Sequence, residues 1–215
     1  MTVDAYVSEV LRRLPVQLID RQTVELDLRM HLLDRMEAGE TEESAVRHMG
    51  TPEETAAELM SGVVLEPASF GRRAGAYVLD LCIGAIPLVA LCLLFLSAQL
   101  GGSHFVLAMT EGPGLLFVVL MVTFAVVALA TAALSVLYFP VLEALWGQTV
   151  GKRLLGMVVV RENGTAIGWV AAIVRRLPFL LEFFMIDALF ALFTARRQRA
   201  FDKVAGTVVV MTRRA

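Results

Sequence analysis

Hydrophobic residues gather in two long runs in the second half of the chain, at 72–98 and 114–142. Both runs exceed the roughly 20 residues that an apolar helix needs to cross the hydrocarbon core of a bilayer. The pattern therefore predicts two membrane-spanning helices. The connection between them contains no lysine or arginine, and it would join the two helices as a hairpin.

A third apolar stretch, 177–194, is shorter and carries two acidic residues, Glu182 and Asp187. Arginines stand on both sides of it, and positively charged residues are retained on the cytoplasmic side of a membrane. We therefore expect this stretch to be a short helix that enters and leaves the membrane on one side, or lies in its interface. A third full span is the alternative.

Residues 1–62 show the shorter amphipathic pattern of a small soluble helical bundle. Four helices are predicted, at 3–14, at 16–38, from Thr41 to Gly50 and from Thr51 to Gly62. Thr51, Pro52 and Glu54 form an N-cap, a first-turn proline and a capping-box acid in register. Spacing along the second helix predicts an inward stripe made of Ile19, Leu26, Met30 and Leu33.

Two β-branched runs, 157–161 and 207–211, interrupt the helical pattern. We expect them to pair in a small cytoplasmic sheet, and Asn163-Gly164 is a tight-turn signal. The predicted fold is therefore mainly α: a cytoplasmic helical bundle, a linker at 63–71, and a helical transmembrane domain at 72–215 with a small β element.

The distribution of charge also changes near residue 70, between the predicted bundle and the predicted transmembrane domain. Residues 1–70 hold 6 basic and 14 acidic side chains, whereas residues 71–215 hold 13 and 7, although the whole chain has a net charge of only −2. Basic pairs precede the first apolar run and follow the second, which predicts a cytoplasmic N-terminus. The acidic N-terminal domain would be repelled by phosphates, so nucleic-acid binding is not expected.

Polar residues in or beside the apolar runs are the candidate functional residues. Asp80 lies within the first run, where a carboxylate needs a partner or a purpose. Arg73, seven residues earlier, shares its helix face, and Asp202 is the predicted partner of Arg73, with a lipid phosphate as the alternative. Asp80 could meet Arg175 or Arg176, take up a cation, or be neutral. Further candidates for an intramembrane or interfacial polar site are Glu143, Arg175, Arg176, Glu182 and Asp187.

The GQTVGKR sequence at 147–153 invites comparison with a phosphate-binding loop. Its glycines are one residue too close for that motif, and Arg153 stands where a Ser or Thr would hold magnesium. No nucleotide, metal or other cofactor is therefore expected, and neither a catalytic triad nor an H-E-x-x-H sequence suggests an enzyme.

Residues 6–60 resemble the HAAS family of small helical signalling domains. The acidic stretch at 25–32, then G-x-T-x-E-x-A, then G-T-P-E-E-T-A-x-E-L carry the resemblance. This resemblance implies contact with another protein rather than catalysis.

Most of residues 70–211 is similar to the RDD family of bacterial membrane proteins. The matching residues are R-x-x-A-x-x-x-D, E-x-x-x-x-G-Q-T-x-G-K-R-L-L-G, R-R and R-x-F-D-K-x-A-G-T. The arginine and two aspartates that name the family match Arg73, Asp80 and Asp202. Glu182 departs from the family pattern, because an aspartate is usual seven residues after the arginine that matches Arg175.

Two functions follow as hypotheses. In the first, which the resemblance slightly favours, the protein transports a cation or small solute across a bacterial inner membrane along Asp80, Glu143, Glu182 or Asp187, regulated by the N-terminal domain. Few spans are available to enclose a pathway, so this requires a homo-oligomer. In the second, the protein is a membrane anchor whose residues 1–62 bind a cytoplasmic partner, and basic residues contact anionic lipid headgroups.

Overall fold

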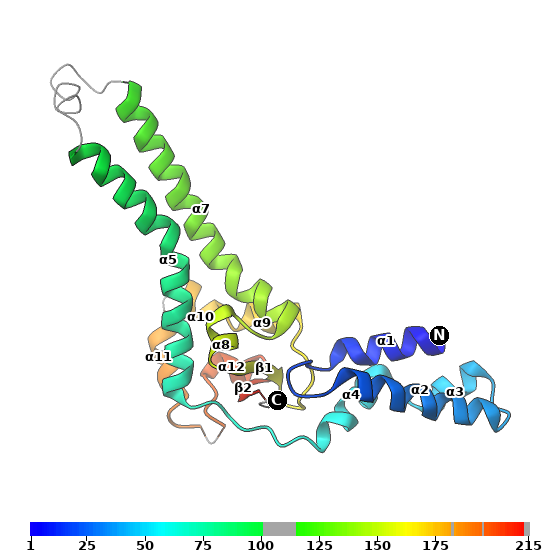
Figure 1. Cartoon of the computed structure of the whole chain (residues 1–215). Helices are drawn as coiled ribbons and strands as arrows, with labels where there is room; N and C mark the ends of the chain where they lie inside the picture. The colour runs from blue at the N-terminus through cyan, green and yellow to red at the C-terminus, as the bar shows by residue number, and fades with distance from the viewer. Residues whose placement is uncertain (101–114, 182, 195, 213–215) are drawn as a thin grey trace.

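The structure, a computed structural model, describes residues 1–100, 115–181, 183–194 and 196–212. Two long helices rise side by side from a compact base, and a smaller helical domain extends sideways from that base, so the molecule is L-shaped (Figure 1). The chain is mainly α with one small two-stranded sheet.

The N-terminal domain, residues 1–62, contains the four predicted helices. These are α1 (Val3–Arg13), α2 (Arg21–Glu37), α3 (Glu42–His48) and α4 (Pro52–Ser61). The Thr41 hydroxyl caps α3 by accepting a bond from the Ser44 backbone, and Thr51 and Glu54 form the predicted capping box of α4. Helix α2 begins later than predicted, because Asp20 caps its first turn.

The predicted inward stripe of α2 is wrong. Leu28 and Leu32 are the buried residues of this helix, whereas Leu26, Met30 and Leu33 are exposed and Ile19 is only partly buried. Helix α2 has apolar residues on two faces, so its spacing cannot say which face packs inward. We refer to Leu26, Met30 and Leu33 as the α2 stripe.

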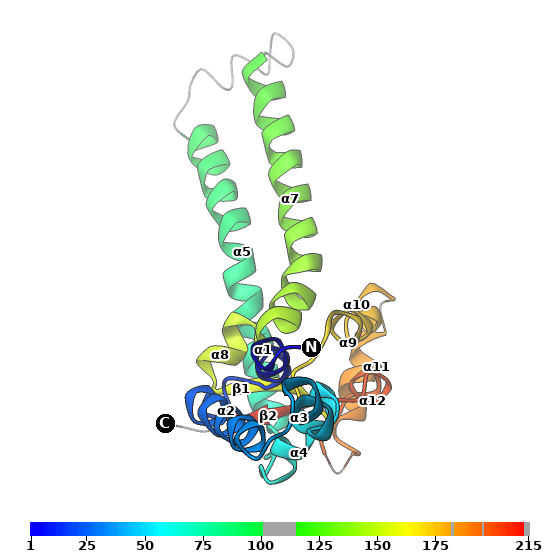
Figure 2. The same cartoon turned by 90° about the vertical axis from the view of Figure 1, so that its right-hand side faces the viewer.

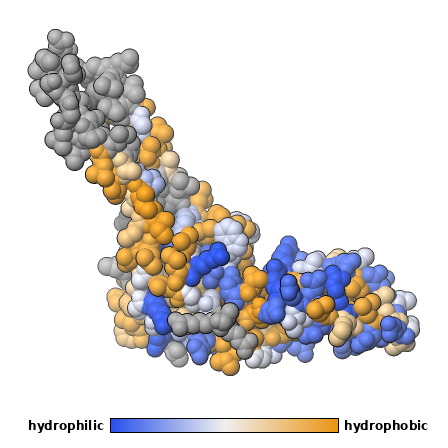
Figure 3. Space-filling view, in the orientation of Figure 1, coloured by the Kyte–Doolittle hydropathy of each residue, from blue (hydrophilic) through white to orange (hydrophobic). Residues whose placement is uncertain are grey.

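The two long apolar runs form α5 (Phe70–Leu100) and α7 (Leu115–Trp146), which we call the hairpin. Many of their described apolar side chains are exposed, and hydrophobic residues form much of the coloured surface of the hairpin (Figure 3). Across the described part of the chain, no helix has the combination of length and apolar character expected of a membrane span. The predicted connection at 99–113 lies almost wholly outside the described residues.

The chain after α7 forms α8 (Val150–Leu154) and then the predicted sheet. Strands β1 (Met157–Arg161) and β2 (Thr207–Met211) are antiparallel, with Met157 opposite Met211 and Arg161 opposite Thr207. The chain turns at Asn163-Gly164 directly after β1, as predicted, and Ala166 forms a β-bridge with Val160. The predicted pairing of the two β-branched runs is confirmed.

The segment between the strands forms α9 (Trp169–Val174), α10 (Leu177–Leu180), α11 (Phe184–Phe190) and α12 (Ala200–Val204). These four short helices lie together at the base of the hairpin (Figure 2). The third apolar stretch thus contains two short helices rather than one, and Glu182 between them lies outside the described residues.

The sheet joins the two parts of the molecule through its opposite faces. Val158, Val160, Val208 and Val210 belong to one core together with the N-terminal domain. Met157, Val159 and Val209 face a second core with the bases of α5 and α9. Because successive side chains of a strand point to opposite faces, the N-terminal domain packs on one side of the sheet and the hairpin on the other.

The segment predicted as a linker, 63–71, is ordered along the sheet edge. Ala68 donates a backbone hydrogen bond to Val209 at 2.9 Å, and Met211 donates one to Glu66 at the same distance. The N-terminal domain is therefore held against the base of the hairpin by backbone contacts as well as by the shared core.

Candidate functional site: a buried charge cluster at the base of the hairpin

Asp202 is the centre of a group of buried charges. It lies in α12, is fully buried, and forms ion pairs with Arg73, Arg175 and Arg199. The Arg175 contact measures 2.9 Å and the Arg199 contact 3.2 Å. The predicted ion pair between Arg73 and Asp202 is therefore present, and the aspartate also holds two arginines that the sequence did not assign to it.

Arg175 links Asp202 to a second buried acid, Glu143. The Arg175 Nε donates to Glu143 Oε2 at 3.0 Å, and its Nη1 also donates to the Thr207 hydroxyl at 2.6 Å. Lys152 forms an ion pair with the other oxygen of Glu143. Arg175 thus connects the last turn of α7 to β2 and α12 through one guanidinium.

Burial and charge act in opposite directions on these acids. Burial alone would raise the pKa of Glu143, but the charges of Lys152 and Arg175 outweigh it and lower that pKa to about 2. Burial likewise opposes ionisation of Asp202, and Arg175, Arg199 and Arg73 together hold its pKa well below the usual range. Both acids are therefore charged at neutral pH.

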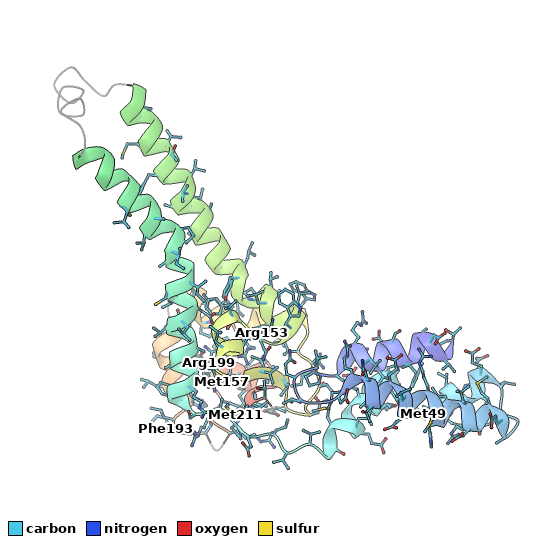
Figure 4. All side chains as sticks on the ribbon, viewed as in Figure 1. Met49, Arg153, Met157, Phe193, Arg199 and Met211 are labelled. Carbon is cyan, nitrogen blue, oxygen red and sulfur yellow. The ribbon has the colours of Figure 1, made fainter. Side chains whose placement is uncertain are left out.

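Asp187, on α11, completes the group. One of its oxygens accepts a hydrogen bond from the Phe201 backbone at 2.8 Å, and the other lies 3.7 Å from Arg199 Nε. The charge cluster, as used below, consists of Arg73, Glu143, Lys152, Arg175, Asp187, Arg199 and Asp202. The label of Arg199 in Figure 4 shows its place beneath the hairpin.

Asp80 is buried nearby and accepts hydrogen bonds from three neutral donors. Tyr138 donates at 2.9 Å, the Thr149 hydroxyl at 2.6 Å and the Gly151 backbone at 2.7 Å. Pairing of Asp80 with Arg175 or Arg176 was one of the alternatives that the sequence left open. Among the described residues Arg175 instead pairs with Glu143 and Asp202, and Arg176 lies against Phe139 and Phe179. The main partners of Asp80 are the N-cap and first turn of α8.

The GQTVGKR sequence explains this contact. Thr149 is the N-cap of α8, and its hydroxyl also accepts a bond from the Lys152 backbone. A Cβ atom at position 151 would lie 2.2 Å from the carbonyl oxygen of Ala76, so only glycine permits α8 to approach α5 this closely. The motif therefore packs the N-terminus of α8 against Asp80. Thr149, as an N-cap residue type, is the feature of the sequence that indicates a helix start here.

Arg176 lies against two aromatic rings. Its guanidinium lies 4.1 Å from the ring centre of Phe139 and 3.9 Å from that of Phe179. Of the candidate polar residues, the structure thus brings Glu143, Arg175 and Asp187 into the charge cluster and places Arg176 beside it. Glu182 lies outside the described residues.

A cavity of about 250 Å³ opens between the charge cluster and the hairpin. Its walls come from α5, α7, α8, α9, α10, α11 and β2, and include Asp80, Arg176 and the rings of Phe70, Phe139 and Phe179. Among the described residues, no group of three His, Cys, Asp or Glu side chains has the arrangement of a metal site. The cavity is therefore a partly apolar space surrounded by fixed charges.

Comparison with known proteins gives the family. A family model described as the RDD family matches residues 67–206, and one described as HAAS matches residues 5–58. Searches of curated proteins and of solved structures found no match. The RDD match contains the whole charge cluster and Asp80, and the HAAS match covers most of the N-terminal bundle. The chain therefore belongs to the RDD family and carries an N-terminal HAAS domain.

Proposed function

We propose that the protein is a membrane-anchored interaction protein of the bacterial inner membrane, without catalytic activity. In this proposal the hairpin lies in the bilayer, the charge cluster fixes its cytoplasmic end, and the HAAS domain binds a cytoplasmic protein. The observation that carries the proposal is the α2 stripe, an exposed apolar helix face on an otherwise acidic domain.

Exposed apolar side chains on the hairpin support a membrane location. Along α5 they include Val78, Ile86, Val89 and Leu93, and along α7 they include Val122, Val126 and Leu129, the last of which is 74% exposed. Soluble monomers rarely expose contiguous apolar surface of this extent. Basic residues lie at the base and not along the described outer parts of the hairpin, which supports a cytoplasmic base.

The position of the third apolar stretch is consistent with this arrangement. Arg175 precedes the stretch and Arg199 follows it, yet both contact Asp202. A single crossing of the membrane would separate the two arginines by the thickness of the bilayer. We therefore favour a segment that lies at the inner interface, beside anionic headgroups.

The α2 stripe supports the interaction role. Leu26 and Met30 are 62% and 60% exposed, and with Leu33 they follow the i, i+4, i+7 spacing of one helix face. Asp27 and Asp34 lie on one side of this face, and Arg29, on the other side, is paired with Asp4 and Glu25. An apolar face with acids along one side, on an acidic domain, fits an amphipathic helix that carries basic residues beside its own apolar face.

The test uses the full chain in detergent, because the N-terminal domain shares its core with the sheet. Met30→Asp puts a charge in the middle of the α2 stripe, and Val64→Asp makes the same change at an exposed position outside the domain. We expect cell extract to yield a bound protein with the wild type and Val64→Asp, and at least tenfold less of it with Met30→Asp. Equal recovery with all three, or none with the wild type, would contradict the proposal.

Transport is the second candidate, and the cavity beside Asp80 favours it. It would require a homo-oligomer, because the described helices of one chain do not surround a pathway. Against a cation site, Asp80 already accepts three hydrogen bonds, and Asp202 is surrounded by arginines. Sodium or proton flux in proteoliposomes that is lost in Asp80→Asn would establish transport. We expect no flux above that of empty liposomes.

A further inference from the structure

The described residues around the cavity at the base of the hairpin carry more positive than negative charge. Its lining contains five basic side chains, Arg73, Lys152, Arg175, Arg176 and Arg199, and three acidic ones, Asp80, Glu143 and Asp187. Asp202, which is buried directly against three of these arginines, brings the acids to four. One positive charge therefore remains uncompensated by these residues.

Two arginine nitrogens at the cavity have no acceptor within the described part of the chain. Arg175 Nη2 and Arg176 Nε are buried, and neither has a hydrogen-bond partner among the described residues. The Arg175 side chain is only 2% exposed. A buried charged donor without an acceptor is costly, and most such groups in proteins are paired. These nitrogens therefore indicate where an acceptor would bind.

The geometry of both arginines is fixed before any ligand arrives. Arg175 is held by Glu143, Asp202 and Thr207, and Arg176 is held between the rings of Phe139 and Phe179. Side chains that are already ordered lose little conformational entropy on binding. The two free donors thus belong to a built site rather than to mobile surface arginines.

We propose that this cavity binds a phosphate group through Arg175 and Arg176. Guanidinium groups pair with phosphate in planar, two-point contacts, and a phosphate has enough oxygens to accept from both arginines at once. Asp187 Oδ2, a buried acceptor that also lacks a hydrogen-bond partner among the described residues, could receive the hydroxyl of a monoprotonated phosphate. A carboxylate ligand could satisfy the arginines but would offer nothing to Asp187.

The cavity has room for more than an ion, and its wall is partly aromatic. Its volume is about 250 Å³, whereas a single water needs only about 10–15 Å³. Phe70 and Phe179 line the cavity and are also partly exposed, which suits a phosphate joined to an apolar group. The same chemistry is found in a free phosphate and in the headgroup of a phosphatidic acid, and the two sources can be separated by experiment.

The experiment measures binding to the full chain in a neutral detergent at constant ionic strength. The probes are inorganic phosphate and a short-chain phosphatidic acid, with a short-chain phosphatidylcholine as the neutral control. Arg176→Gln removes one proposed donor that is in none of the cluster's ion pairs. Arg153→Gln is the matched control, because Arg153 is an exposed arginine of α8 that does not line the cavity.

We expect at least one phosphate probe to bind and to raise the unfolding temperature of the wild type. Arg176→Gln should weaken this binding at least tenfold, as the loss of a charged hydrogen bond requires, and Arg153→Gln should leave it unchanged. Binding of both probes identifies the phosphate itself as sufficient, and binding of the lipid alone identifies a headgroup site. If Arg176→Gln does not fold, Arg176→Lys keeps the charge but removes Nε, and should also weaken binding.

Two outcomes would overturn the proposal. One is that neither phosphate probe binds the wild type, which would mean that water satisfies the free donors. The other is that phosphate or phosphatidic acid binds the wild type and the folded Arg176 variant equally, which would place the anion elsewhere on the basic surface.

Discussion

Ion pairs in the N-terminal domain and at the base of the hairpin have similar lengths but very different surroundings. Arg29 and Asp4 approach to 2.5 Å, and their side chains are 39% and 79% exposed. Arg175 and Asp202 approach to 2.9 Å, and their side chains are 2% and 0% exposed. Distance alone would rank the exposed pair higher.

Burial reverses that ranking. Water and salt screen the exposed pair, so such contacts contribute at most about 1 kcal/mol. In the charge cluster, each group depends on the others for compensation, because an unpaired charge in the interior is far more costly than one at the surface. The comparison indicates that the RDD part of the chain depends on its charges for folding, whereas the HAAS domain depends mainly on its apolar core.

Among the substitutions considered, Asp202→Asn should cause the greatest loss of stability. The change keeps the side-chain shape but leaves Arg73, Arg175 and Arg199 without their shared acid, so we expect it to lower the free energy of unfolding by about 3–5 kcal/mol. Denaturant unfolding of the purified protein in detergent measures this loss. A loss below about 1 kcal/mol would mean that Glu143 and Asp187 can compensate all three arginines.

A second prediction concerns acid. The folded-state pKa of Glu143 is about 2, below its value in an unfolded chain, so its ionisation stabilises the fold at neutral pH. This stabilisation is fully present above about pH 4.5 and is lost as the pH falls towards 2. Its total is about 3 kcal/mol.

Comparison of the wild type with Glu143→Gln isolates this effect. The variant should be less stable at pH 7, because Lys152 and Arg175 lose their partner, but its stability should fall less between pH 5 and pH 2. Unfolding midpoints across that pH range provide the measurement. Parallel curves for the two proteins would show that Glu143 does not titrate with a lowered pKa.

The smallest expected effect belongs to the exposed pair. Asp4→Asn removes the short contact with Arg29, yet we expect a loss below about 1 kcal/mol, which should shrink further in high salt. Denaturant unfolding at low and high salt, alongside Asp202→Asn, checks this. An equal loss from both substitutions would remove the distinction between the two regions.

Some features of the protein follow from local sequence patterns. The apolar runs predict the two long helices, the threonine caps predict α3 and α4, and the β-branched runs predict the pairing of β1 with β2. The sequence also named Asp202 as the candidate partner of Arg73, with a lipid phosphate as the alternative, and the structure contains this ion pair. Except for that pair, the patterns that gave these features are formed by residues close together in the chain.

Other features depend on which segments meet. Helix α2 has two apolar faces, and packing in the N-terminal core selects Leu28 and Leu32 over the α2 stripe. The third apolar stretch is divided between α10 and α11, and its arginines converge on one aspartate although they are far apart in the chain.

Sequence patterns were enough for the four N-terminal helices, the two long helices, the two strands and the presence of buried charges that need partners. The short helices between the strands, and the identity of the partners, became clear only from the folded chain: Thr149 and Gly151 for Asp80, and Arg175 as the link between Glu143 and Asp202. The physical reason is that helix and strand formation depends on side chains a few residues apart. The pairing of a buried charge depends instead on the close approach of distant segments, such as the contact of α8 with α5 that Gly151 allows.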